Sequence, residues 1–182
     1  MAARQEHPIK RRWLATAVLF LSTCLPIPPA LAQADLCVLI PDKHSPNDRI
    51  LHCGTAVTVR PAPGTSYHPL DAGSDRPTSA VQLDSGALLI EFHPTQKRRN
   101  FQILTPQAIA AVRGTRWAME VKPGQSSTLV LKGAVQVARA NGAAAVVLRR
   151  GQGVDVTDAA GPLQVKRWAP QRVKALLARF GP

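Results

Sequence analysis

Residues 101–121 constrain the fold more than any other stretch of the chain. They contain two apolar runs, Phe101–Leu104 and Trp117–Val121, which are separated by Thr105-Pro106 and by Gly114. Pro106 cannot donate a hydrogen bond to a strand ladder, so the first strand should end at Thr105. Gly114 indicates either a positive φ or a close approach of backbones, and the alternation in the second run is typical of a half-buried strand. We therefore expect a strand, a corner and a second strand.

Short segments in which a glycine stands at the head of an expected strand recur further along the chain. The sequence SGALLI at 85–90 is echoed by KGAVQV at 132–137 and, more loosely, by GQGVDV at 151–156. Glycine at the head of successive strands suits a fold in which strands turn tight corners and stack in layers. Aromatic residues make up 4% of the chain, so its core must be mainly aliphatic. We predict an all-β fold, a jelly-roll or β-solenoid-like stack of short strands with a C-terminal amphipathic helix.

The motifs of this region resemble those of a known family. In chain order they are Thr105-Pro106, VRGT at 112–115, TLVL at 128–131 and GAVQV at 133–137. This series closely resembles the FecR domain, the extracytoplasmic β module of iron-citrate-type signalling regulators, over about residues 79 to 156. The resemblance implies an all-β fold and a role in binding or signal relay rather than catalysis. Those regulators carry a cytoplasmic anti-sigma region and a membrane helix before the β domain, so we expect a standalone member here.

The residues of the family-like corner are expected to be mainly structural. Arg113 should bond to neighbouring carbonyl groups or pair with a carboxylate such as Glu120, and Thr115 should cap the turn through its hydroxyl. The full set of motif residues is Thr105, Pro106, Arg113, Gly114, Thr115 and Gly133.

Residues 1–34 have the pattern of a secretory signal peptide. A basic segment ending at Lys10-Arg11-Arg12 is followed by the apolar run Trp13–Leu25 and by small residues. The run is shorter than the about 20 apolar residues that a membrane helix needs. We expect cleavage after Ala32 or Ala34, a periplasmic location and no transmembrane span in the mature chain. A lipoprotein signal ending at Cys24 is the alternative.

Two cysteines remain once the signal peptide is removed, Cys37 and Cys53, and export places them in an oxidising compartment. We predict a disulfide between them, closed by a turn-rich segment. Nearby histidines raise the alternative of a metal site, but the spacing lacks the CxxC or HxxxH pattern of zinc sites, and we expect no metal. The histidines concerned are His44, His52 and His68.

The segments that flank the FecR-like β domain, which we place at 79–157, differ in character. Residues 35–78 should hold the disulfide loop, a strand within 54–60 and a Pro/Gly-rich loop with little regular structure from Pro61 to Pro77. Residues 158–182 should form a linker and a helix that packs on the β core, with Trp168 at its start. Pro170 opens this helix and Gly181 closes it. One face carries Val173, Leu176, Leu177 and Phe180, and the other faces carry Arg172, Lys174 and Arg179.

No group of residues in the sequence is typical of an enzyme. His93 stands outside any catalytic motif, and the carboxylates Asp84, Glu91 and Glu120 fall at positions that look solvent-facing. Phosphate- and dinucleotide-binding motifs are absent, so we predict no enzymatic activity and no cofactor.

The charge of the chain bears on its partners. The formal net charge of +12 falls to +9 without the residues before Gln33, and the basic clusters lack the interleaved aromatic residues typical of nucleic-acid binding. We expect a non-catalytic interaction or signalling module that contacts an envelope protein, such as an outer-membrane or inner-membrane receptor. The alternative is a basic envelope protein that binds polyanions or glycans.

Overall fold

The structure is a computed structural model that describes residues 37–41, 49–70, 79–95, 100–112 and 114–181. The chain divides into two compact units, 1–32 and 33–182, and every described residue lies in the second. The expected signal peptide, the side chain of Arg113 and the histidine at position 44 therefore fall outside the described residues. Within the described part, no helix has the length and hydrophobicity needed to cross a membrane.

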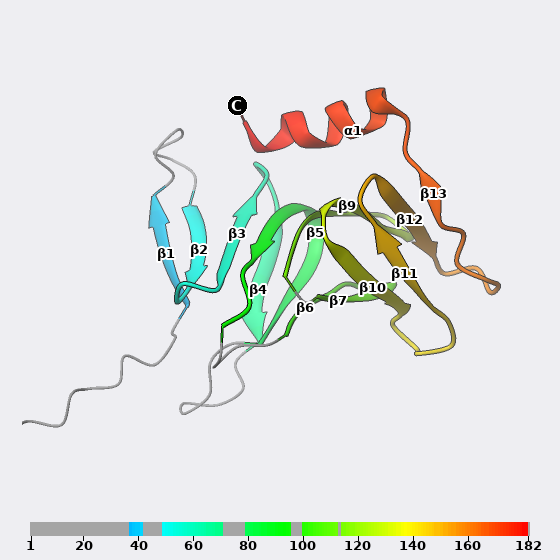
Figure 1. Cartoon of the computed structure of the whole chain (residues 1–182), viewed down its shortest axis with the longest axis horizontal. Coiled ribbons are helices and arrows are strands. Elements are labelled where there is room, and N and C mark those ends of the chain that lie inside the picture. Colours follow the sequence, from blue (N-terminus) through cyan, green and yellow to red (C-terminus); the bar gives the residue numbers. More distant parts are fainter. Residues whose placement is uncertain (1–36, 42–48, 71–78, 96–99, 113, 182) are drawn as a thin grey trace, which may run out of the picture. The chain divides into compact units, whose positions relative to one another are not determined.

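The described part of the chain consists of strands followed by one short C-terminal helix, as the sequence predicts (Figure 1). The helix α1 spans Pro170–Leu177 and continues as a 3-10 turn at Ala178–Phe180. The strands are β1 Cys37–Pro41, β2 Arg49–Cys53, β3 Val57–Pro61, β4 Ser66–Leu70, β5 Ala80–Phe92, β6 Phe101–Leu104, β7 Ala108–Val112, β8 Thr115–Lys122, β9 Gln125–Lys132, β10 Ala134–Arg139, β11 Ala145–Arg149, β12 Gln152–Thr157 and β13 Lys166–Arg167.

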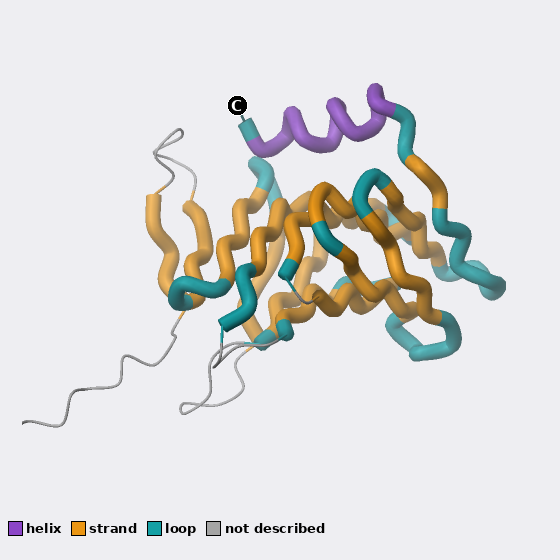
Figure 2. The backbone as a smooth tube through the Cα atoms, in the orientation of Figure 1, coloured by secondary structure: helices purple, strands orange, loops and turns teal. Residues whose placement is uncertain are grey.

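The strands belong to one curled sheet that has two layers, which we call layer A and layer B (Figure 2). Layer A contains β1, β2, β3, the second half of β5, β8, β9, β12 and β13, and layer B contains β4, the first half of β5, β6, β7, β10 and β11. Only β5 and β6 pair in parallel among the described strands. The aliphatic core lies between the two layers, with Trp117, Phe92 and Phe101 as its largest buried side chains.

The long strand β5 belongs to both layers because it bends at Gly86. Residues before Gly86 pair with β4, whereas residues from Gly86 onward pair with β8. Gly86 has φ 91°, and a Cβ there would lie 2.5 Å from Oγ1 of Thr65. That same hydroxyl bonds both the N–H and the carbonyl of Ala87, so the bend is closed by a side chain from the β3–β4 connection.

Gly114 and the glycines at the head of the two later echoed segments mark further crossings between layers. The chain passes from β7 to β8 at Gly114, from β9 to β10 at Gly133 and from β11 to β12 at Gly151, with φ values of 75°, 83° and 78°. For Gly114, the positive-φ alternative is confirmed. These left-handed conformations carry a steric penalty for any residue with a Cβ.

Two regions differ from the expectations drawn from sequence. The stretch 101–121 contains an additional strand, β7, which the sequence pattern did not reveal because its buried and half-buried positions are all apolar. The loop expected from Pro61 to Pro77 includes strand β4 at Ser66–Leu70, which pairs with β5, so that expectation was wrong for those residues. Tertiary pairing stabilises a strand whose own sequence contains Pro69 and His68.

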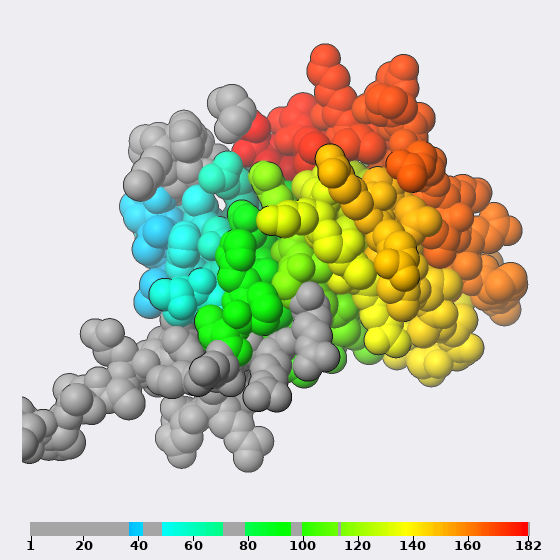
Figure 3. Space-filling view, in the orientation of Figure 1, coloured from blue at the N-terminus to red at the C-terminus, as the bar shows by residue number. Residues whose placement is uncertain are grey.

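The C-terminal helix covers the outer face of layer A, and Figure 3 shows the C-terminal segment, in red, packed across the top of the strand region. Pro170 occupies its first turn and Gly181, with φ 78°, follows its end, which confirms the predicted limits. Leu176 and Phe180 are buried, and Val173 and Leu177 are half-buried against the same cluster. The helix packs on Ala62, Ala87, Ala118 and Leu129, of which the small strand residues Ala87 and Ala118 allow close packing.

Candidate interaction site

The family-like corner is a contact between two crossings of the chain. A Cβ on Gly133 would lie 2.6 Å from Cγ2 of Thr115 and 2.7 Å from the carbonyl oxygen of Gly114. Real Cβ atoms do not approach backbone this closely, so only glycine allows the two crossings to lie side by side. The pairing of Arg116 with Lys132 directly follows this contact. The motifs around Gly114 and Gly133, distant in sequence, therefore form one structural unit.

A small pocket of about 190 Å³ lies beside this corner. The hydroxyl of Thr115 is buried there and has no hydrogen-bond partner among the described residues. Contrary to the expectation from sequence, it therefore does not cap the turn. Nε2 of His93 lies 3.4 Å from Oε1 of Glu91 at the exposed rim. The lining residues are Glu91, Phe92, His93, Pro94, Gly114, Thr115, Arg116 and Lys132. The pocket could hold a small polar group, and its geometry does not assemble a nucleophile with a base.

Thr105 and Pro106 lie at the other end of the β6–β7 hairpin from Gly114. The hydroxyl of Thr105 donates to the carbonyl of Ala108 at 2.8 Å and accepts from its N–H at 2.9 Å. Thr105 thus closes the turn, and Pro106 is exposed within it. The structure therefore does not bring all the motif residues together: Gly114, Thr115 and Gly133 form one cluster, whereas Thr105 and Pro106 stabilise a separate turn.

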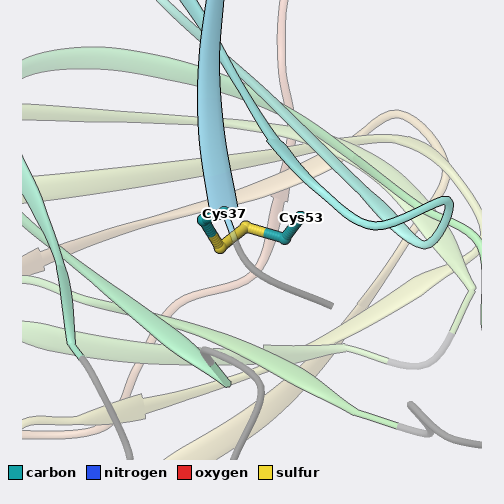
Figure 4. The surroundings of a disulfide bond; sticks show 2 residues. All are labelled: Cys37 and Cys53. Carbon is teal, nitrogen blue, oxygen red and sulfur yellow. A yellow bond between two sulfur atoms is a disulfide. The ribbon is translucent and has the colours of Figure 1, made fainter. Parts of the chain in front are cut away.

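The first hairpin carries the disulfide. Cys37 and Cys53 face each other in the register of β1 and β2, with their Cα atoms 3.9 Å apart, and their sulfurs are bonded (Figure 4). The predicted pairing is confirmed. The described residues contain no group of three or more histidine, cysteine or acidic side chains placed to hold a metal ion.

Strand β1 is an edge strand with exposed apolar side chains. Within the described residues it pairs with β2 alone. Val38, Leu39 and Ile40 are 53%, 50% and 40% exposed, although each is a large aliphatic residue. An edge strand presents unpaired backbone groups, and proteins commonly protect such edges with charges or proline. Strand β1 carries no charged side chain and its proline, Pro41, stands only at its last position, so the edge from Val38 to Ile40 has the properties of a surface that accepts a strand from another protein.

Two ion pairs join the helical segment to layer A, and sequence reasoning missed both. Arg179 pairs with Glu120, whose other oxygen is 2.9 Å from Nζ of Lys122. Nη1 of Arg172 donates to Oδ2 of Asp155 at 2.9 Å. The expectation of a solvent-facing Glu120 was wrong, because its side chain is only 12% exposed. The signal available in the sequence was a carboxylate at an outward position of β8 and of β12.

The environment of Asp155 holds its carboxyl group ionised. Burial alone would raise the pKa of Asp155, but hydrogen bonds from Arg172 and from the Ser127 hydroxyl, together with the charges of Arg172 and Lys166, outweigh burial. The pKa of Asp155 is therefore lower than its ordinary value. The guanidinium of Arg172 also lies 3.5 Å from the ring centre of Trp168, so a cation–π contact accompanies its ion pair with Asp155.

These features define the class of the protein: an all-β module in two layers, with an exposed strand edge and a structural corner where its sequence motifs meet. Residues 52–136, a little under half of the chain, match the family described as FecR protein. The match begins in β2, upstream of the motifs, and ends in β10. No curated protein matches the sequence significantly.

Solved structures support the fold. Two crystal structures of a "putative anti-sigma factor" from Parabacteroides distasonis, at 2.50 Å and 1.65 Å resolution, superpose with TM-scores of 0.54 and 0.53. Their sequences are 17% and 15% identical to this chain, so the likeness concerns the fold alone. In each case the match covers 79% of this chain and 61% of the other, so this chain spans about three fifths of their length.

Proposed function

We propose that the protein is an exported, non-catalytic signalling module that acts in the periplasm by contact with a protein of the cell envelope. The match to the FecR family at 52–136 and the fold shared with anti-sigma-factor-like structures support a regulatory role. The signal-peptide pattern of residues 1–34 and the disulfide between Cys37 and Cys53 support export to an oxidising compartment.

The exposed edge of β1 is the observation that carries the mode of contact. Three consecutive aliphatic residues, Val38 to Ile40, have side chains on both faces of the hairpin and are all exposed. A strand added along this edge would satisfy the backbone groups of β1 and cover those side chains together. The disulfide at Cys37 holds the strand against β2, so little order would have to be gained on binding. The partner is therefore a protein that offers an extended segment.

A photo-crosslinking experiment tests this proposal. A benzophenone amino acid placed at Leu39 should crosslink one discrete envelope protein. The matched control is Val147, which is 56% exposed on the edge strand β11 and should give no such product. The crosslink should disappear when Val38 and Ile40 are both replaced by lysine, because charged side chains block strand addition. Identical products from positions 39 and 147, or none from 39, would contradict contact through β1.

The alternative, binding of polyanions or glycans, is favoured by a group of exposed basic residues at the β11–β12 corner and on β13. They are Arg149, Arg150, Lys166 and Arg167. Retention on immobilised heparin that weakens steeply with salt, and that is lost in Arg149→Gln/Arg150→Gln, would favour this function. Elution at low salt without any effect of these substitutions would exclude it.

A further inference from the structure

A groove of about 710 Å³ lies along helix α1 and belongs neither to the corner nor to the edge of β1. Its volume falls in the range of small-molecule sites in proteins. One side is formed by the helical segment, and the other by the β11–β12 corner and the residues that lead into the helix. The lining residues are Gly151, Arg167, Trp168, Pro170, Val173, Lys174, Leu177, Ala178 and Gly181. Most of this lining is apolar.

The wall opposite the helix is held in place by specific contacts. The N–H of Trp168 donates to the carbonyl of Gly151 at 3.3 Å. The indole of Trp168 packs so closely on Gly153 that a Cβ there would overlap it, and the Arg172 guanidinium stacks on its ring. Arg167 lies over Gly151, where a Cβ would be 3.0 Å from Nη1. The groove is therefore formed before any ligand binds, which lowers the cost of binding.

The charged side chains that line the groove are all basic. Arg167 and Lys174 are the two charged residues of the lining, and the lining contains no carboxylate. Neither residue has a carboxylate partner within the described part of the chain, whereas the nearby Asp155 already binds Arg172. Val173 and Leu177, which also line the groove, are half-buried and pack on the apolar cluster beneath the helix. An apolar body that bears one negative charge would complement this arrangement.

We propose that the groove binds a single anionic amphiphile, an acyl chain with a carboxylate head. The chain would cover Val173, Leu177 and Ala178, and the carboxylate would be bound by Arg167 and Lys174. The helical segment from Pro170 to Gly181 offers roughly 16 Å of length at the rise of a helix. The extended chain of dodecanoate has a similar length, so dodecanoate is a suitable probe.

The test is calorimetric titration of the mature, disulfide-bonded protein with sodium dodecanoate below its micelle concentration. We expect saturable binding of one molecule per chain. The double substitution Arg167→Gln/Lys174→Gln should weaken binding at least tenfold. The control is Lys166→Gln, which removes one positive charge from the residue next to Arg167 in β13, outside the groove lining, and should leave the affinity unchanged.

A second variant tests the apolar part of the groove. Ala178→Trp places a large ring in the groove from an exposed position and should abolish binding without loss of thermal stability. The proposal is overturned if dodecanoate does not bind, if dodecyltrimethylammonium binds equally well, or if Ala178→Trp binds normally. It is also overturned if Lys166→Gln weakens binding as much as the double variant, or if the protein binds phosphatidylglycerol vesicles but not monomeric dodecanoate.

Discussion

At the scale of single residues, the family-like corner shows why particular amino acids stand at particular positions. Gly133 lies against the carbonyl of Gly114 and the methyl group of Thr115, so its lack of a side chain determines how closely the two crossings approach. Gly114 itself is only moderately crowded, since a Cβ there would lie 3.3 Å from Cδ of Pro94, and its main requirement is the positive φ. Close contact with the neighbouring backbone is thus the particular constraint at Gly133, whereas the positive φ is the main constraint at Gly114.

Gly133→Ala should lower the free energy of unfolding by about 2 to 3 kcal/mol, since both the positive φ and the backbone clash oppose a Cβ. Gly142→Ala is the matched control, because Gly142 has φ 73° but nothing within 4 Å of a Cβ, and should cost about 1 kcal/mol. Urea unfolding of both variants measures the difference. Equal costs would show that the close approach at Gly133 is unimportant for stability.

Thr115→Val should raise the free energy of unfolding by about 1 kcal/mol, because a buried hydroxyl without a partner is replaced by a methyl group. Thr105→Val is the matched control: it is equally buried but loses two hydrogen bonds to Ala108, and should lower stability by about 1 to 3 kcal/mol. Urea midpoints compare the two. A lower midpoint for Thr115→Val would mean that its hydroxyl has a stabilising role.

At the scale of elements, the helix is attached to layer A in two ways. Its apolar stripe is buried over small residues of the strands, and Arg172 and Arg179 bind the outward carboxylates Asp155 and Glu120. The apolar stripe supplies the larger part of the stabilisation, since ion pairs near the surface contribute at most about 1 kcal/mol each. The ion pairs orient the helix on the sheet, which in turn positions the groove beside it.

The stabilisation contributed by the ion pair between Asp155 and Arg172 should depend on pH. Because the pKa of Asp155 is lowered in the folded protein, its contribution to stability is complete above the unfolded value of about 3.9 and is lost as pH falls through the folded pKa. The stability difference between the wild type and Asp155→Asn should therefore be constant from neutral pH to about pH 5 and narrow below about pH 4. Urea unfolding across this range measures it. A difference that grows on acidification would contradict the lowered pKa.

At the scale of the whole molecule, one curled sheet supplies the core, the corner and the edge. The crossings at glycine let the chain pass between the two layers, and the disulfide joins the two strands of the hairpin at one end of layer A. This hairpin lies almost entirely outside the residues that match the FecR family, 52–136, and so does the proposed contact surface on β1.

Replacing both Cys37 and Cys53 by alanine should lower the free energy of unfolding by about 3 kcal/mol, as expected for a bridge that closes a short loop. Hydrogen exchange should show faster exchange in β1 and unchanged protection in β8 and β9, because the disulfide restrains the edge and not the centre of the sheet. Peptide mapping without reduction should recover the two cysteines joined in the wild type. Free thiols at both positions would contradict the pairing.

The exported protein should begin close to Gln33 or Asp35, because the small residues of the signal pattern place the cleavage site after Ala32 or Ala34. Mass spectrometry of protein from the periplasmic fraction measures this N-terminus. An intact chain starting at Met1 and embedded in the membrane would contradict cleavage, and a lipid-modified Cys24 would show the alternative signal.

The sequence by itself determined the features that neighbouring residues specify. Alternation predicted the strand at Trp117–Val121, Pro106 ended the strand before it, and glycine marked the corners. The stripe of Leu176 and Phe180 predicted the helix and its buried face. Each of these depends on interactions within a few residues, where backbone geometry and hydrophobic periodicity act directly.

Only the tertiary structure decided which distant residues meet. Gly133 contacts Thr115, Arg172 binds Asp155, and β4 becomes a strand by pairing with β5, and no local pattern indicates these partners. Strand register decides such contacts, because a shift of one residue moves every side chain to the opposite face of a sheet. Register results from the packing of the whole core, and for that reason the edge at β1 and the groove beside α1 could be recognised only in the folded chain.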